Sequence, residues 1–325
     1  MISSGAKNST IVRAEERRRA ARRRRAARQL AVVRARLAVL QRLAPRRAAR
    51  LALDLWCTPP SGGGRRHDNR TSAGALSTMT TDAGAVLTVE TWSPDLSRLG
   101  DGAQEAGVVY LVHGWGGWRG QLGAFAEPLR AAGYRVVAFD APSHGESGPG
   151  AFGPGRSTMP EMADALSAVV HAHGDAAAVV AHSLATATTV LAIRDGLPTA
   201  RLLLVAAIDD ALGEIDGFGD MLGLRRPTRE RLNELVTEVA GRPLSDLDVR
   251  DTLATHPVPP ALVVHDRDDK ELRYAVGAAL AADWPEGELL TTEGLGHHRI
   301  LRDPAVVQAV VDYVSPVRTG GPAQP

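Results

Sequence analysis

The stretch from Ala176 to Val190 constrains the fold of this 325-residue chain more than any other. Its first part ends at Ala181 and is a short apolar run, typical of a fully buried strand. An Ala/Thr/Leu-rich segment with helical propensity begins after Ser183 without any polar linker. A serine thus lies at the apex of an abrupt strand-to-helix turn. The turn needs small residues at positions 181 and 185, and alanine meets that need less completely than glycine. Taken alone, a serine between small residues is more often a buried hydroxyl or a helix cap.

Strand-like and helix-like segments alternate through the rest of the chain after residue 71. Alternation at this length predicts an α/β fold with a doubly wound, mostly parallel sheet, and ligands then bind at the carboxyl ends of its strands. The predicted strands are 76–80, 86–92, 107–113, 134–139, 178–181, 200–207, 261–265 and 289–292, and the predicted helices include 121–132, 158–172, 275–283 and 304–314.

Residues 209–256 interrupt this alternation. Their clearest element is a helix opened by Thr228, with Leu232, Leu235 and Val239 along one face. We expect this insertion to form a short helical lid over the carboxyl edge of the sheet. The predicted organisation is a basic arm, amphipathic helix and linker over 1–70, a catalytic domain over 71–317, and a tail over 318–325.

Positive charge is concentrated in the N-terminal segment. Residues 1–50 contain sixteen Lys and Arg against two Glu, whereas the remainder contains 22 basic and 35 acidic side chains. The arginine-dense part, residues 1–28, predicts a solvated tail that does not compact. Leu30, Val33 and Leu37 then recur at helical spacing. Such a segment could contact anionic membrane or nucleic acid, or pack on the acidic body. We favour packing of the helix on the protein.

Cysteine content and hydropathy bear on the compartment. Cys57 is the single cysteine, so no intrachain disulfide forms, and no apolar run approaches the ~18 residues of a membrane span. We expect a cytoplasmic protein that is peripheral to the membrane at most. The oligomeric state is not predicted.

Three predicted strands end in residues that hydrolytic chemistry requires. Ser183 follows one, the run 266–269 (Asp-Arg-Asp-Asp) follows a later one, and His297 follows the last. A serine hydroxyl needs an imidazole to take its proton and a carboxylate to orient that imidazole. The His113-Gly-Trp-Gly-Gly turn supplies flexible backbone. The amides of Trp115 and Leu184 are the predicted oxyanion donors, each worth roughly 3 kcal/mol.

These motifs resemble the α/β-hydrolase superfamily, and most closely bacterial serine esterases, monoacylglycerol lipases and serine aminopeptidases. The order Ser…Asp…His is that of the superfamily, and its G-x-S-x-G signature has alanine at both glycine positions here. The resemblance runs from about residue 108 to 314. It implies Ser183 as nucleophile, His297 as general base and Asp269 as acid, three residues past Asp266, which replaces a common glycine.

Alternatives to these assignments remain open. Asp268 is the main alternative acid, with Asp209 and Asp210 behind it, and His298 is the alternative to His297. His182 is expected to be structural, since neighbouring side chains diverge at such a turn. Two further pairs are not expected to act in catalysis or to bind metal: His113 and His144, which more often brace loops, and His171 and His173, which point to different helix faces.

The sequence therefore predicts a serine hydrolase that cleaves an ester, or an amide or thioester, through an acyl-enzyme. No cofactor or metal is expected. The alternative function is a binding or scaffold protein of the same fold that has lost activity and is recruited by its basic arm to anionic lipid or nucleic acid.

Overall fold

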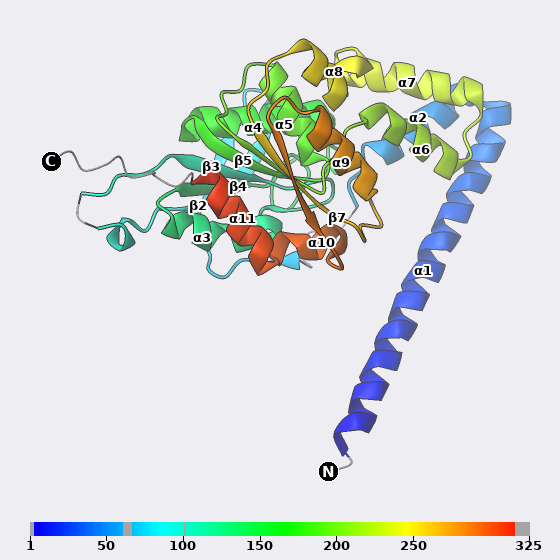
Figure 1. The fold of residues 1–325 in the computed structure, drawn as a ribbon. Helices are drawn as coiled ribbons and strands as arrows, with labels where there is room; N and C mark the ends of the chain where they lie inside the picture. The colour runs from blue at the N-terminus through cyan, green and yellow to red at the C-terminus, as the bar shows by residue number, and fades with distance from the viewer. Residues whose placement is uncertain (1–2, 61–66, 101, 316–325) are drawn as a thin grey trace. The chain divides into compact units, whose positions relative to one another are not determined.

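A computed structural model describes residues 3–60, 67–100 and 102–315 (Figure 1). The chain divides into two compact units. One comprises the residues up to 55 together with 213–236, and the other comprises 56–212 and the residues from 237 onward. The predicted linker at 61–66 and the predicted tail at 318–325 lie outside the described residues.

The larger unit is built on one eight-stranded sheet in the order β1-β2-β4-β3-β5-β6-β7-β8 (Figure 1). The first two strands form an antiparallel hairpin, and β2 also pairs antiparallel with β4. All other neighbours in the sheet are parallel, which confirms the predicted fold class. The strands are β1 (Ala75–Thr80), β2 (Val86–Trp92), β3 (Val108–Val112), β4 (Arg135–Phe139), β5 (Ala176–His182), β6 (Leu202–Val205), β7 (Ala261–Asp266) and β8 (Gly287–Thr292).

Helices cover both faces of the sheet because its strands are apolar on both sides. In β3, Tyr110 belongs to the core on one face and Leu111 to the core on the other. The first core includes α4 (Met159–His173), α5 (Ala185–Arg194) and α9 (Tyr274–Asp283). The second includes α3 (Ala126–Ala131) and α11 (Pro304–Val314), which Figure 1 shows on the opposite side.

Helix boundaries in this unit follow local capping chemistry. The Thr158 hydroxyl and the Glu161 carboxylate form a reciprocal capping box at the start of α4. The helix predicted over 121–132 is instead a 3₁₀ segment, η3 (Arg119–Phe125), followed by α3. Gly123 lies in η3 where a Cβ would come within 2.8 Å of the Arg70 backbone, so contact with a distant segment sets its conformation.

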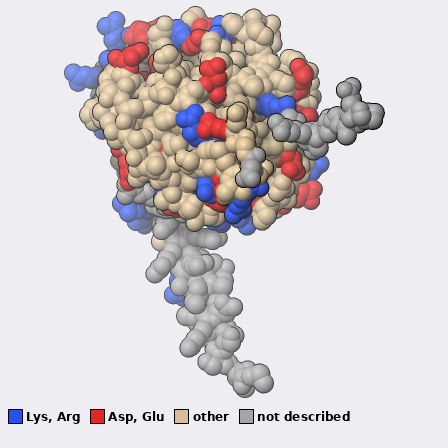
Figure 2. All heavy atoms as spheres, turned by 90° about the vertical axis from the view of Figure 1, so that its left-hand side faces the viewer, with Lys and Arg blue, Asp and Glu red and all other residues tan. Residues whose placement is uncertain are grey.

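Short elements complete this unit. Acidic and basic side chains are interspersed on the face shown in Figure 2. Within this unit, Arg135 forms an ion pair with Glu105. The short elements are η2 (Leu96–Arg98), η4 (Leu244–Leu247), α8 (Val249–Thr255), α10 (Gly296–Arg299) and η5 (Ile300–Arg302).

The smaller unit is helical. It contains α1 (Ser3–Leu43) and most of α2 (Pro45–Trp56), of α6 (Ala211–Leu222) and of α7 (Arg226–Ala240). The predicted tail over 1–28 is α-helical from Ser3, a conformation that its charge pattern did not predict. Alanine and arginine both have high helix propensity, which accounts for the helix.

The C-terminal part of α1 is tied to the insertion. Leu37 is fully buried, and the Gln41 side chain accepts a hydrogen bond from the Arg225 N–H at 2.5 Å and donates to the Gly223 carbonyl at 3.3 Å. Residues 209–256 form α6, α7, η4 and α8. The lid role of this insertion and the predicted domain boundaries stay predictions.

Candidate active site

Ser183 lies at a sharp turn between β5 and α5. Its φ is +58°, a conformation that non-glycine residues rarely adopt. The Ser183 N–H donates to the Val205 carbonyl of β6 at 3.0 Å, and the Ser183 carbonyl accepts from the Thr186 N–H at 2.9 Å. Ala181 and Ala185, at the predicted small positions, are fully buried. The turn therefore presents a half-buried serine side chain on a fixed backbone.

The loop after β3 packs directly on this turn. A Cβ on Gly114 would lie 2.8 Å from the His182 carbonyl oxygen and 3.5 Å from the Leu184 nitrogen. Only glycine allows that approach. Among the described residues, no backbone carbonyl accepts from the N–H of Trp115 or of Leu184. The two predicted oxyanion donors are therefore not used in backbone hydrogen bonds within the described residues.

Buried histidines tie this loop to the loop after β4. His113 Nδ1 donates to the Gly114 carbonyl at 2.8 Å, and its Nε2 accepts from the Ala141 N–H at 3.1 Å. Burial lowers the pKa of His113 to about 4, which keeps this neutral tautomer. The His144 ring packs edge-on against Trp115 at 5.2 Å, and burial lowers its pKa to about 3. Both histidines brace loops.

A buried ion-pair network fixes the far end of the same loop. Asp140, at the end of β4, accepts from the Arg119 N–H at 2.7 Å and also pairs with its guanidinium at 2.5 Å. The guanidinium reaches Glu90 at 3.1 Å and Glu146 at 2.7 Å. Arg119 and Asp140 are nearly inaccessible to solvent. Charge-assisted bonds of this kind hold geometry firmly, so residues 114–119 are anchored at both ends.

Asp269 and His297 meet at the edge of the sheet formed by β7 and β8. His297 Nδ1 lies 2.7 Å from Asp269 Oδ2, and both side chains are buried. Asp269 Oδ1 accepts from the N–H groups of Glu271 and Leu272. Burial raises the pKa of Asp269, but the His297 hydrogen bond and these N–H groups outweigh it, and the pKa lies below its usual value. The alternative acid, Asp268, instead accepts from the Gly294 N–H at 3.0 Å.

Asp266 joins the loops that carry Asp269 and His297. It is fully buried at the end of β7. Its Oδ1 accepts from the N–H groups of Asp268 and Gly296 at 3.0 and 2.9 Å, and its Oδ2 accepts from the Thr292 hydroxyl and the Leu295 N–H at 2.7 and 3.0 Å. These bonds outweigh burial and lower the pKa of Asp266. The residue that replaces a common glycine thus positions the histidine loop.

His182 links the Ser183 turn to His297. Its Nε2 donates to the His297 carbonyl at 3.0 Å, and the two rings are 4.7 Å apart between centroids. Its Nδ1 is buried and has no hydrogen-bond partner among the described residues. Burial holds the pKa of His182 well below its usual value. Among the described residues Ser183 Oγ makes no hydrogen bond to His297, and contacts that are loose in an unliganded site often tighten only on binding.

The other candidates lie elsewhere or serve other contacts. His298 is 39% exposed and its Nε2 lies 3.2 Å from Glu271. Asp209 pairs with Arg250 at 2.8 Å, and its neighbour Asp210 is exposed. His171 is exposed and His173 is partly exposed, and both lie near the C-terminus of α4. Sequence reasoning missed Glu271 and Arg119, because neither belongs to a motif of the triad.

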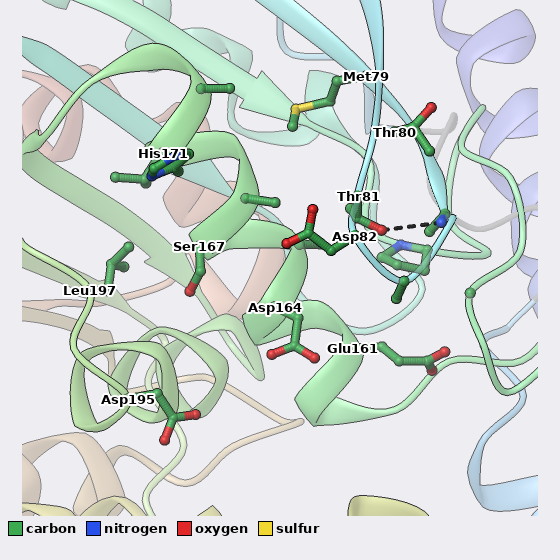
Figure 3. Close-up of a pocket in the computed structure, with 18 of the residues that line it drawn as sticks. Met79, Thr80, Thr81, Asp82, Glu161, Asp164, Ser167, His171, Asp195 and Leu197 are labelled. Carbon is green, nitrogen blue, oxygen red and sulfur yellow. Dashed lines mark hydrogen bonds between the residues drawn. The ribbon is translucent and has the colours of Figure 1, made fainter.

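A cavity of about 650 Å³ lies between α4, the β1–β2 turn and residues 195–198 (Figure 3). Neither Ser183 nor His297 lines it. Five carboxylates are among its lining residues, and two of them already have structural partners, since Glu161 caps α4 and Asp195 pairs with Arg242. The five are Asp82, Glu161, Asp164, Asp175 and Asp195.

The described residues offer neither a metal site nor a membrane span. No group of three or more His, Cys, Asp or Glu side chains there is arranged to hold a metal ion. Within the same residues no helix has the length and apolar character needed to cross a bilayer.

Solved structures similar to this one include several esterases. An esterase from Exiguobacterium antarcticum matches with a TM-score of 0.55 at 17% identity, covering 74% of this chain and 99% of that one. Est1E from Butyrivibrio proteoclasticus, in a structure with ferulic acid bound, matches with a TM-score of 0.55 at 18% identity, over 73% and 96%. A thermophilic esterase from Thermogutta terrifontis matches with a TM-score of 0.54 at 18% identity, over 74% and 98%. At these identities the likeness shows a common fold.

The sequence itself was compared with curated proteins and with family profiles. No functionally curated protein matches it. The profile of the alpha/beta hydrolase family matches residues 109–310, which is more than half of the chain and spans β3, the Ser183 turn and His297. The chain therefore belongs to the alpha/beta hydrolase family.

Proposed function

We propose that this protein is a serine hydrolase that cleaves a carboxylic ester through an acyl-enzyme. The observation that carries the proposal is the 2.7 Å contact between Asp269 Oδ2 and His297 Nδ1. It lies at the carboxyl ends of the parallel strands, as does the strained Ser183 turn, and the His182 hydrogen bond to the His297 carbonyl joins the two. An ester is favoured over an amide or thioester because the similar structures include several esterases.

The arrangement assigns a role to each group in acylation. Ser183 Oγ attacks the carbonyl carbon while His297 Nε2 takes its proton, and Asp269 holds Nδ1–H and stabilises the imidazolium. The N–H groups of Trp115 and Leu184 stabilise the oxyanion. The C–O bond to the alcohol then breaks, and Nε2 returns the proton to the departing oxygen. Water repeats these steps on the acyl-enzyme and releases the acid.

A fluorophosphonate probe tests the nucleophile. We expect the wild-type protein to be labelled at Ser183, and Ser183→Ala to lose both labelling and ester turnover, the latter by about 10⁴-fold or more. Ser143 provides a matched control, because it also has a positive φ, of +60°, and lies in the loop after β4. Ser143→Ala should still be labelled. Failure of the folded wild type to react would favour the binding or scaffold alternative.

A further inference from the structure

Glu271 lies beside the nitrogen of His297 that faces away from Asp269. It sits in the loop between β7 and α9, and its side chain is 57% exposed. Its Oε1 is 3.2 Å from His298 Nε2, and its Oε2 is 3.8 Å from His297 Nε2. The His67 ring stacks on His298 at 5.0 Å, which restricts the ring that holds Oε1. The second carboxylate oxygen is thereby kept near the reacting nitrogen.

The position of Nε2 fixes where a leaving group must be. In the proposed mechanism Nε2 passes its proton to the departing alcohol oxygen, so that oxygen must come within about 3 Å of Nε2. Glu271 Oε2 is then no more than about 7 Å from the departing oxygen. A charged nitrogen two carbons along the alcohol can close most of that gap. The acyl chain leaves the carbonyl carbon in another direction.

The charge at this position is negative. The hydrogen bond from His298 lowers the pKa of Glu271, so the group is a carboxylate at neutral pH. Asp269 is also ionised, since its pKa lies below the usual value. Two carboxylates therefore flank the His297 ring. A cationic leaving group would be attracted to this side of the ring, and an anionic one would be repelled.

We propose that Glu271 forms a leaving-group subsite that selects esters of cationic alcohols, with an ammonium group two carbons from the ester oxygen. This inference rests on the proposed function, because it uses the proton transfer from His297. It concerns only the alcohol part of the substrate. Glu271 acts by direct contact with the leaving group.

Two esters of equal shape test the subsite: butyrylcholine and 3,3-dimethylbutyl butyrate, which differ in one positive charge. The ratio of their kcat/KM values is measured in the wild type and in Glu271→Gln. We expect the ratio to fall about threefold to tenfold in the variant, as is typical of a partly exposed ion pair. The control is Glu105→Gln, because Glu105 is an ion-paired carboxylate that precedes β3, at the opposite end of that strand from Gly114. It should leave the ratio unchanged.

Binding of the same esters to Ser183→Ala separates the two hypotheses. Calorimetry on Ser183→Ala and on Ser183→Ala/Glu271→Gln should show the same fall in the ratio of dissociation constants, with no turnover required. If the folded wild type hydrolyses neither ester and also fails to react with the fluorophosphonate, the proposed function fails, and the binding ratio still decides on Glu271. An unchanged ratio in the Glu271→Gln variants would overturn the subsite.

Discussion

The Ser183 turn and the Asp269–His297 edge hold their residues in different ways. At the turn, position comes from backbone and small side chains: Ala181 and Ala185 are fully buried and Gly114 packs against the chain. At the edge, position comes from one buried carboxylate, because Asp266 accepts four hydrogen bonds from two loops. An added atom should therefore disrupt the Ser183 turn, which depends on close packing. A changed charge should disrupt the Asp269–His297 edge, which depends on hydrogen bonds to a carboxylate.

The largest effect is expected at the edge. Asp269→Asn should lower kcat by about 10³–10⁴-fold, because the amide cannot hold His297 in the required tautomer or stabilise its charged form. Asp268→Asn is the matched control, since Asp268 is bonded to the Gly294 N–H and not to His297. It should retain most of the activity. Steady-state kinetics on a neutral ester measure both, and the reverse order of effects would make Asp268 the acid.

Removing the charge of Asp266 should come next. In Asp266→Asn, an NH₂ group replaces one carboxylate oxygen and faces N–H or O–H donors that bond to that oxygen in the wild type. These buried donors lose their acceptor, which should lower the free energy of unfolding by roughly 3 kcal/mol. Denaturant unfolding measures the loss. Asp303→Asn is the control, because Asp303 accepts two N–H bonds at the start of α11 and asparagine caps helices equally well. A cost no larger than that of Asp303→Asn would show that the edge needs no carboxylate.

At the Ser183 turn, adding a single carbon atom at Gly114 should be enough to lower kcat. A Cβ on Gly114 would lie 2.8 Å from the His182 carbonyl and 3.0 Å from the Ser183 Cβ. Gly114→Ala should therefore shift the oxyanion donors and lower kcat by about tenfold to a hundredfold. Gly148→Ala is the control, as its Cβ would meet nothing closer than 3.5 Å. Equal kcat values for the two variants would show that the close approach of Gly114 to the turn does not position the oxyanion donors.

The two regions also differ in how far sequence could predict them. The turn was predictable, because smallness at 181 and 185 and the strand-to-helix change are local in the chain. So was the sheet, since its strands are apolar runs separated by helices. The role of Asp266 was not, because three of its four hydrogen-bond partners are 26–30 residues away and only the fold brings them together. The roles of Arg119 and Glu271 could not be predicted for the same reason. The two histidines beside Glu271 follow β8, and the carboxylates bound to Arg119 lie more than 20 residues away.

The pH dependence of stability should separate the regions further. His182 has a folded-state pKa well below its usual 6.5, so the unfolded chain binds a proton that the folded one does not. The free energy of unfolding is therefore not reduced by His182 above pH 6.5. Below pH 6.5 it falls by up to about 1.4 kcal/mol per pH unit because of this residue. His182→Asn should reduce this slope. Asp266, whose pKa is lowered, should act only below about pH 3.8. Unfolding curves from pH 7 to pH 3 would show whether the two variants change different ranges.

The smallest effect on catalysis is expected far from both regions. Deleting residues 1–28 removes ten of the sixteen basic residues in residues 1–50 but none of Ser183, Asp269 or His297. The described side chains of this part of α1 are exposed. Ester kinetics should change less than twofold, whereas binding to anionic vesicles or to DNA should weaken. In the intact chain this binding should fall steeply with salt, because it depends on counterion release.

Deleting through residue 60 also removes Leu37 and the buried face of α2, including Leu53. That deletion should lower the melting temperature where the shorter one does not. Lost activity on deleting only 1–28 would mean that catalysis depends on the arm.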